Sequence, residues 1–247
     1  MQRFFVSESS FGGEWVQLSP EQAHQVCHVL RLRAGDSVVL LDNAGFEYDA
    51  ALLTVAGHEA TCRVTARRPA SGEPTVQLTL FQSLLAREKF EWVLQKGTEV
   101  GVTRFVPVRT QRSIVRARKI DEKKLQRWHR ILTEAAEQSH RGRIPHLDQE
   151  MDFAEAVSGL ADFDRALVAA PSDGAVSLKE ALRSQAAAPS SVALLIGPEG
   201  GFVEAEVALA CESGALKITL GPRVLRTETA AVVASALILY EFDQMRP

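Results

Sequence analysis

The stretch Val192–Ala231 reads VALLIGPEGGFVEAEVALACESGALKITLGPRVLRTETAA and predicts the fold of the chain. A short apolar run, Val192 to Ile196, ends in a glycine-rich turn, and a helical pattern follows. A second apolar run, Ala215 to Leu220, ends at Gly221 and a polar segment, after which an apolar helix begins. Buried strands that alternate with helices are typical of a parallel sheet, in which ligands bind outside the carboxyl ends of the strands. We therefore expect the two loops to form one site.

The remainder of the chain divides at the linker Pro69 to Pro74, which gives expected domains of residues 1–70 and 75–247. Before the linker, short apolar runs separated by turn signals predict a small β-rich unit. After it, strands alternate with helices, which predicts a mostly parallel α/β sheet. In the first part, Ser19 as N-cap and Pro20 at the first helical position predict a helix to about Leu30.

Composition excludes several classes of protein. The chain has 247 residues, of which 46% are hydrophobic, and no apolar run approaches the roughly 20 residues that span a bilayer. Because the N-terminus lacks the apolar core of a signal peptide, we expect a cytoplasmic protein without a membrane partner. Cys27, Cys62 and Cys211 form no C-x-x-C pair, so we expect buried, reduced thiols. His24 and His28 are four residues apart beside Cys27, but a structural role or an RNA contact is favoured over a metal site.

Positive charge is concentrated in the middle of the chain. Residues 86–143 carry 15 Lys and Arg against 7 Asp and Glu, whereas residues 144–247 carry 7 against 15. One basic segment between acidic ones indicates a local surface for a polyanion, although a solvated helix face is the simpler alternative. Few aromatic residues are interleaved, which favours contacts to the backbone of structured nucleic acid over stacking on single strands.

The motifs of several common enzymes are absent from the sequence. It contains no G-x-G-x-x-G fingerprint, no phosphate loop of the G-x-x-x-x-G-K-[ST] type, no G-x-S-x-G and no H-E-x-x-H. At the start of the last helix, a capping box would explain Thr227 or Glu228. It would not explain Arg226, because a cation is disfavoured at a helix N-terminus. Arg226 is therefore expected to face a substrate.

Five stretches together resemble the RsmE family of 16S ribosomal RNA (uracil-N3) methyltransferases. They are GPEGGF at 197–202, LGPRVLRTETA at 220–230, KFEWVLQKGTEVGV at 89–102, EAAEQSHRGRIP at 134–145 and HVLRLRAGD at 28–36. One departure is Val203, where the resemblance leads us to expect a serine that would cap the following helix.

The resemblance implies more than the residue pattern does. It implies a SPOUT-type domain with a C-terminal trefoil knot, preceded by a small PUA-like β-barrel domain that binds RNA. It also implies a homodimer, S-adenosylmethionine as the cofactor, no metal, and a uridine of 16S rRNA in the small ribosomal subunit as the target. The implied cofactor-binding residues are Ala169, Ala170, Leu195, Ile196, Gly197, Pro198, Glu199, Gly200, Gly201, Leu220, Gly221, Val224, Leu225, Arg226 and Thr229.

For catalysis we expect Arg226 to stabilise a developing uridinate and Glu228 to act as base or to orient Arg226. The expected RNA contacts are Arg3, His28, Arg31, Arg33, Arg109, Arg112, Arg116, Arg141 and Arg143. Three alternatives remain at this point: a SPOUT methyltransferase acting on another RNA, a catalytically silent RNA-binding or assembly factor, and a nucleotide-binding metabolic enzyme. The sequence leaves open whether free rRNA or the assembled subunit is the substrate.

Overall fold

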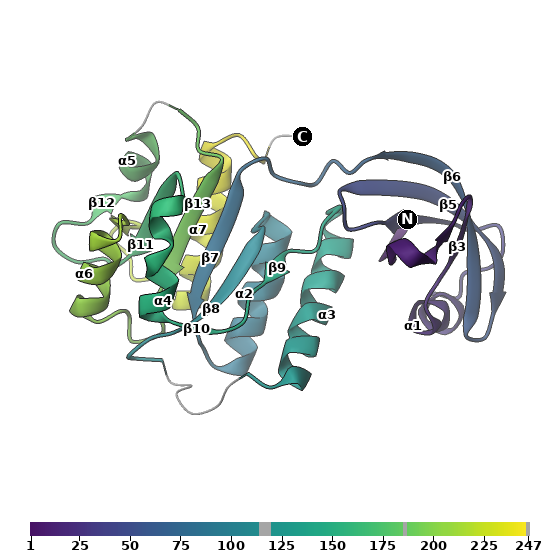
Figure 1. Cartoon of the computed structure of the whole chain (residues 1–247), viewed down its shortest axis with the longest axis horizontal. Coiled ribbons are helices and arrows are strands. Elements are labelled where there is room, and N and C mark those ends of the chain that lie inside the picture. Colours follow the sequence, from purple (N-terminus) through teal and green to yellow (C-terminus); the bar gives the residue numbers. More distant parts are fainter. Residues whose placement is uncertain (114–119, 185–186, 246–247) are drawn as a thin grey trace. The chain divides into compact units, whose positions relative to one another are not determined.

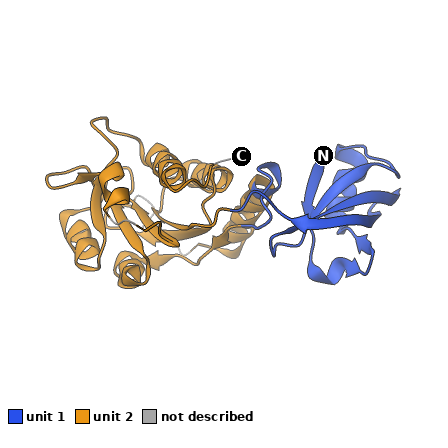
Figure 2. Cartoon of the chain, turned by 90° about the horizontal axis from the view of Figure 1, so that it is seen from above, with its two compact units in different colours: residues 1–73, 136–144 blue, residues 74–135, 145–247 orange. Residues whose placement is uncertain are grey.

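The computed structural model describes residues 1–113, 120–184 and 187–245. The chain forms two compact units (Figure 2). Unit 1 comprises Met1–Glu73 and Ala136–Ile144, and unit 2 comprises Pro74–Ala135 and Pro145–Pro247. Within the described ranges, no helix has the length and apolar character needed to cross a membrane. The expected Arg116 lies outside the described residues.

Unit 1 is built on a six-stranded mixed sheet. Its strands are β1 (Gln2–Phe5), β2 (Phe11–Gly12), β3 (Trp15–Gln17), β4 (Ser37–Leu41), β5 (Phe46–Ala56) and β6 (Glu59–Pro69). Their order is β1-β4-β5-β6-β3-β2, in which β1 pairs parallel with β4 and the other pairs are antiparallel. The pairings of unit 1, all of whose residues are described, do not join β1 to β2. The sheet that we expected as a small barrel is therefore open at this edge.

The helix of unit 1 begins as its sequence predicts and ends differently. Ser19 is the N-cap of α1 (Pro20–His24), and its hydroxyl accepts a hydrogen bond from the amide of Gln22, whose side chain in turn accepts from the amide of Ser19. After His24 the chain continues as a π-helical turn, Gln25–Val29, instead of regular α-helix. Ala23 and Val26 are buried against the sheet residues Phe4, Val16, Leu40 and Leu52.

A second segment of chain, Ala136–Ile144, returns to unit 1 at the end of the helix α3 (Glu122–Gln138). Arg141 is only 2% exposed, and its guanidinium donates to both carboxylate oxygens of Glu73 at 3.2 and 3.0 Å. The same carboxylate accepts from the amides of Gly142 and Arg143, each at 3.0 Å. Burial of an ion pair requires such additional hydrogen bonds, because both charges lose their water. The sequence pattern predicts one domain boundary near residue 70, and this boundary assigns the returning segment to the second domain instead of to unit 1.

In the residues that the structure describes, unit 2 contains eight parallel strands with helices on both faces (Figure 1). The strands are β7 (Gln77–Ser83), β8 (Arg104–Arg109), β9 (His146–Leu147), β10 (Met151–Asp152), β11 (Arg165–Ala169), β12 (Val176–Ser177), β13 (Ser191–Ile196) and β14 (Leu216–Thr219). Their order is β10-β8-β7-β13-β11-β14-β12, and β9 pairs with β8. The longer helices are α2 (Arg87–Val100), α3 (Glu122–Gln138), α6 (Glu204–Glu212) and α7 (Thr227–Glu241); α4 (Phe153–Ser158) and α5 (Leu178–Arg183) are short.

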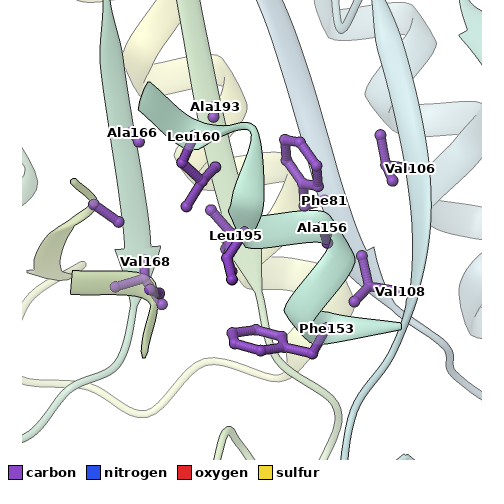
Figure 3. Packing of buried hydrophobic residues seen from close by; sticks show 13 residues of the cluster. Phe81, Val106, Val108, Phe153, Ala156, Leu160, Ala166, Val168, Ala193 and Leu195 are labelled. Carbon is purple, nitrogen blue, oxygen red and sulfur yellow. The ribbon is translucent and has the colours of Figure 1, made fainter. Parts of the chain in front are cut away.

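The core of the sheet explains why its strands read as continuous apolar runs. Five of the six residues of β13 are buried, because helices cover both faces of the strand. On one face α4 and α6 pack against alternate residues of the central strands (Figure 3), including Phe81, Val168 and Leu195. On the other face α7 packs against α2, β7 and β13. Full burial of side chains of this size stabilises a fold by about 1.5–3 kcal/mol each.

Candidate active site

The carboxyl ends of three adjacent strands meet where the sequence predicts a site. Ala169 of β11 lies in register with Ile196 of β13 on one side and with Ile218 of β14 on the other. The glycine-rich loop 197–201 follows β13, and the loop 220–226 follows β14. A cavity of about 760 Å³ lies between these loops. Sites for small molecules have volumes of roughly 300–1,000 Å³, and this cavity lies within that range.

The shape of the glycine loop depends on its sequence. The amide of Gly201 donates to the carbonyl of Pro198 at 2.8 Å, which closes a tight turn. Gly201 has a φ of +67°, a conformation that residues with a Cβ adopt rarely. A Cβ on Gly197 would lie 3.1 Å from the amide nitrogen of Phe202, so this position also has little room for a side chain.

The glycine loop is tied to the start of α7 by a buried hydroxyl. Thr227 is 8% exposed, and its Oγ1 donates to the carbonyl of Gly197 at 2.5 Å. The side-chain amide of Gln82, at the end of β7, donates to the same hydroxyl at 3.4 Å. These bonds connect both loops of the cavity to a central strand.

Charged groups of both signs line the cavity. Glu199 is paired with Lys89 of α2 at 2.9 Å. Arg226 is the N-cap residue of α7 and is exposed at the cavity wall. Glu228 follows in the first turn, and its Oε2 is buried without a hydrogen-bond partner among the described residues. Such an oxygen can accept a proton or a hydrogen bond from a ligand.

The cavity brings together most of the residues that the resemblance implied. Twelve of the fifteen expected cofactor residues line it, and so do both expected catalytic residues, Arg226 and Glu228. Three do not: Leu195 is buried in the core, Ala170 donates its amide to the carbonyl of Ile218, and Thr229 lies beyond the lining. The further lining residues are Lys89, Pro171, Ile218, Thr219, Arg223, Thr227 and Ala230. Of these, only the residues next to the loops 197–201 and 220–226 could have been found from their position in the sequence. Lys89 comes from the distant helix α2.

Two of the expected RNA contacts are internal cations. Arg141 is buried on Glu73, and the Arg3 side chain, which is 9% exposed, pairs with Glu47. A side chain that is buried in an ion pair within its own unit cannot also contact an RNA at the surface. We therefore leave both arginines out of the RNA surface.

The other expected RNA contacts in the described chain are partly or fully exposed. Arg109 is half-buried between Glu150 and Asp152; the hydrogen bond with Asp152 raises the pKa of its guanidinium. Arg143 is exposed and donates to the carbonyl of Ala44 at 2.8 Å. His28, Arg31, Arg33 and Arg112 are exposed as well.

None of the cysteines and histidines is among the residues that line this cavity. The three cysteines are free thiols: Cys62 is buried, which raises its pKa to about 11, Cys27 is half-buried and Cys211 is exposed. The expected burial of Cys211 is therefore wrong. His24 and His28 lie with ring centroids 4.7 Å apart, and His58 joins them at 5.6 Å from His24. No group of three metal-binding side chains suited to an ion was found in the described part of the chain.

The sequence and the fold match known RNA methyltransferases. An RNA methyltransferase domain matches residues 72–239, and an RNA methyltransferase PUA domain matches residues 18–65. Ribosomal RNA small subunit methyltransferase E of Bacillus subtilis is 33% identical over 100% of this chain and 99% of its own length. The chain belongs to this family. The resemblance that its motifs carry is thereby confirmed, as are a PUA-like first unit and a SPOUT-like all-parallel second unit.

Solved structures of relatives show the same architecture with a cofactor bound. Ribosomal RNA small subunit methyltransferase E from Neisseria gonorrhoeae, bound to S-adenosyl methionine, has a TM-score of 0.86 and 32% identity over 98% of both chains. A putative methyltransferase from Legionella pneumophila, in complex with the same cofactor, has a TM-score of 0.86 and 32% identity over 97% of both chains.

Proposed function

We propose that this protein transfers a methyl group from S-adenosylmethionine to N3 of a specific uridine in the 16S rRNA of the small ribosomal subunit. The observation that carries the proposal is the cavity between the two loops at the strand ends, in a chain of the methyltransferase E family. The cytoplasm, where ribosomal subunits are found, is the proposed location.

The residues of the cavity suit S-adenosylmethionine. Apolar side chains of Ile196, Ile218, Leu220 and Leu225 offer walls for an adenine ring, and the backbone of the glycine loop offers polar groups beside them. The mixed charges of the lining suit a ligand that carries an ammonium, a sulfonium and a carboxylate. When bound, this cofactor supplies a methyl group that is already activated by its sulfonium. The protein therefore requires neither a metal nor a covalent nucleophile, and its task is alignment.

Two side chains of the second loop are proposed to act on the uridine. N3 of uridine carries a proton and becomes a good nucleophile only when that proton is lost. The carboxylate of Glu228, whose Oε2 has no hydrogen-bond partner among the described residues, is proposed to accept this proton or to orient Arg226. The guanidinium of Arg226 is proposed to lie near O2 or O4 of the base, where it stabilises the negative charge that develops.

Replacing Arg226 tests this mechanism. In Arg226→Ala we expect methyl transfer to fall by about two to three orders of magnitude, as on removal of other groups that stabilise a developing anion. Cofactor affinity should change much less, and Arg226→Lys should keep part of the rate because the charge remains. Turnover of the alanine variant at the wild-type rate would remove Arg226 from the mechanism.

We propose that RNA contacts cationic side chains of both units. In unit 1 these are Arg31, Arg33, Arg143 and His28; in unit 2 the proposal adds Arg109, which is half-buried, and Arg116, which lies outside the described residues. Charge reversal of Arg31 and Arg33 should weaken RNA binding and reduce its dependence on salt. Binding that keeps its strength and its salt dependence would make these arginines ordinary surface residues.

We also propose that the C-terminal segment has the knotted topology of SPOUT proteins. We further propose a homodimer in which α7 packs against α7 of the second chain. Val233, Leu237 and Tyr240 are 37, 46 and 71% exposed and recur at helical spacing, so α7 presents apolar groups on one outer face. Light scattering after gel filtration should give twice the chain mass for the wild type and a lower mass for Leu237→Glu. A wild-type protein with the mass of one chain would contradict the dimer.

A further inference from the structure

The segment after β8 lies against the glycine loop of the cavity. Nη1 of Arg112 donates to the carbonyl of Gly200 at 2.8 Å. The stem of the same side chain covers this glycine, because its Cδ and Cβ lie 3.4 and 3.5 Å from the position that a Cβ on Gly200 would take. The sequence pattern predicts an RNA contact for Arg112, whereas in the structure its guanidinium binds the backbone of the proposed cofactor loop.

The residues on either side of Arg112 fix its backbone. Thr110 and Ser113 are 7 and 2% exposed and join through their hydroxyls at 2.8 Å, and the Ser113 hydroxyl also accepts from the Thr110 amide. The amide of Gln111 donates to Oε1 of Glu206 at 2.7 Å. Oε2 of Glu206 accepts from the amide of Val203, which follows the glycine loop closely. Arg112 therefore extends from a fixed turn.

With the hydrogen bond from Arg112, both polar groups of the Gly200–Gly201 peptide are held by hydrogen bonds. The carbonyl of Gly200 and the amide of Gly201 belong to the same planar peptide group. Arg112 holds the carbonyl, and the carbonyl of Pro198 accepts from the amide. Because glycine has many accessible conformations, a loop with Gly200 and Gly201 side by side needs such bonds to keep one shape. Both glycines line the cavity.

We propose that Arg112 is a positioning residue of the methyl-donor site. It holds the Gly200–Gly201 peptide in the shape that binds S-adenosylmethionine, and it does so before any RNA is bound. This inference rests on the proposed function, because it assumes that the cavity takes this cofactor. It assigns Arg112 to the cofactor loop and not to the set of RNA contacts.

The test is isothermal titration of S-adenosylmethionine into the full-length protein without RNA. In Arg112→Ala we expect the dissociation constant to rise roughly three- to thirtyfold, since a hydrogen bond from a charged donor is lost. Arg112→Lys should recover part of the affinity. The matched control is Arg104→Ala: Arg104 begins the strand that Arg112 follows, and it pairs with Asp148 at the opposite end of β8. Its removal should leave the affinity unchanged.

Steady-state methyl transfer supplies a second readout. A positioning role should raise the KM for S-adenosylmethionine in Arg112→Ala more than it lowers kcat, whereas simple loss of folded protein would lower only the apparent kcat. Unchanged cofactor affinity in Arg112→Ala, with the wild type binding normally, would overturn the inference while leaving the proposed function intact. An equal loss in the Arg104 control would also overturn it. A wild type that binds no cofactor would refute the proposed function itself, and the inference with it.

Discussion

Thr227→Val should destabilise the glycine loop that lines the cavity, although it changes the volume of the side chain little. The valine keeps the volume of the threonine and removes the hydroxyl that donates to Gly197 and accepts from Gln82. The carbonyl of Gly197 loses this bond, whereas the Gln82 amide keeps its bond to the carbonyl of Ser83. Loss of one buried partner costs about 1–3 kcal/mol.

Two assays measure this effect. For a chain of this size, each kcal/mol corresponds to a change of about 2–4 °C in Tm, so the variant should melt roughly 2–12 °C below the wild type. Affinity for S-adenosylmethionine should fall by up to about tenfold, because the loop that the hydroxyl anchors lines the cavity. Differential scanning calorimetry and isothermal titration supply the two numbers.

Two matched variants separate the anchor from general effects on α7. Thr227→Ser keeps the hydroxyl and should keep most of the affinity. Ser235→Ala removes another buried hydroxyl of the same helix, one that donates only to the carbonyl of Ala231 within the helix, and it should leave cofactor binding unchanged. If Thr227→Val binds the cofactor as tightly as the wild type, the hydroxyl does not shape the cavity and the reasoning is wrong.

Three further predictions concern single positions. Gly201→Ala should lower the free energy of unfolding by about 1 kcal/mol and weaken cofactor binding, because the φ of Gly201 is positive. Gly200→Ala should be tolerated, because a Cβ there makes only ordinary van der Waals contacts. Equal effects of the two variants on cofactor titration would contradict this difference. Val203→Ser should raise the stability to urea by up to about 1 kcal/mol, since a hydroxyl at this N-cap can accept from the first turn of α6; unchanged unfolding would refute it. The hydrogen bond from Arg127 lowers the pKa of Glu91, so this pair stabilises the fold above the unfolded pKa of about 4.3 and the effect is lost as pH falls through the folded value. Glu91→Gln should therefore cost about 1 kcal/mol at pH 7 and nothing in strong acid, measured by urea unfolding at both; the same cost at both would exclude the ion pair as its cause.

The strands and loops of the site were predictable because their signals are local. A run such as Val192 to Ile196 is apolar at every position, which a strand covered on both faces requires, and the glycines mark the turn that follows. The predicted run Val192 to Ile196 appears as the strand Ser191–Ile196, and the predicted run Ala215 to Leu220 appears as the strand Leu216–Thr219.

The side chains that hold the site were not predictable because they come from distant segments. Lys89 lies 110 residues from its partner Glu199, and Arg112 lies 88 residues from Gly200, so no periodicity connects them. For the same reason, charge counting could not separate the buried Arg141 from exposed arginines. A basic residue has the same formal charge on a surface and inside an ion pair, and only its neighbours decide which applies.

The most direct test of the central claim is methyl transfer from labelled S-adenosylmethionine, with the modified base mapped. Small ribosomal subunits, naked 16S rRNA and tRNA should be assayed in parallel, because the first two arms distinguish an assembled substrate from free RNA. The account predicts label on N3 of one uridine of 16S rRNA and none on tRNA. Cofactor binding without label on either form of 16S rRNA would contradict the assigned target, and absence of cofactor binding would contradict the methyltransferase itself.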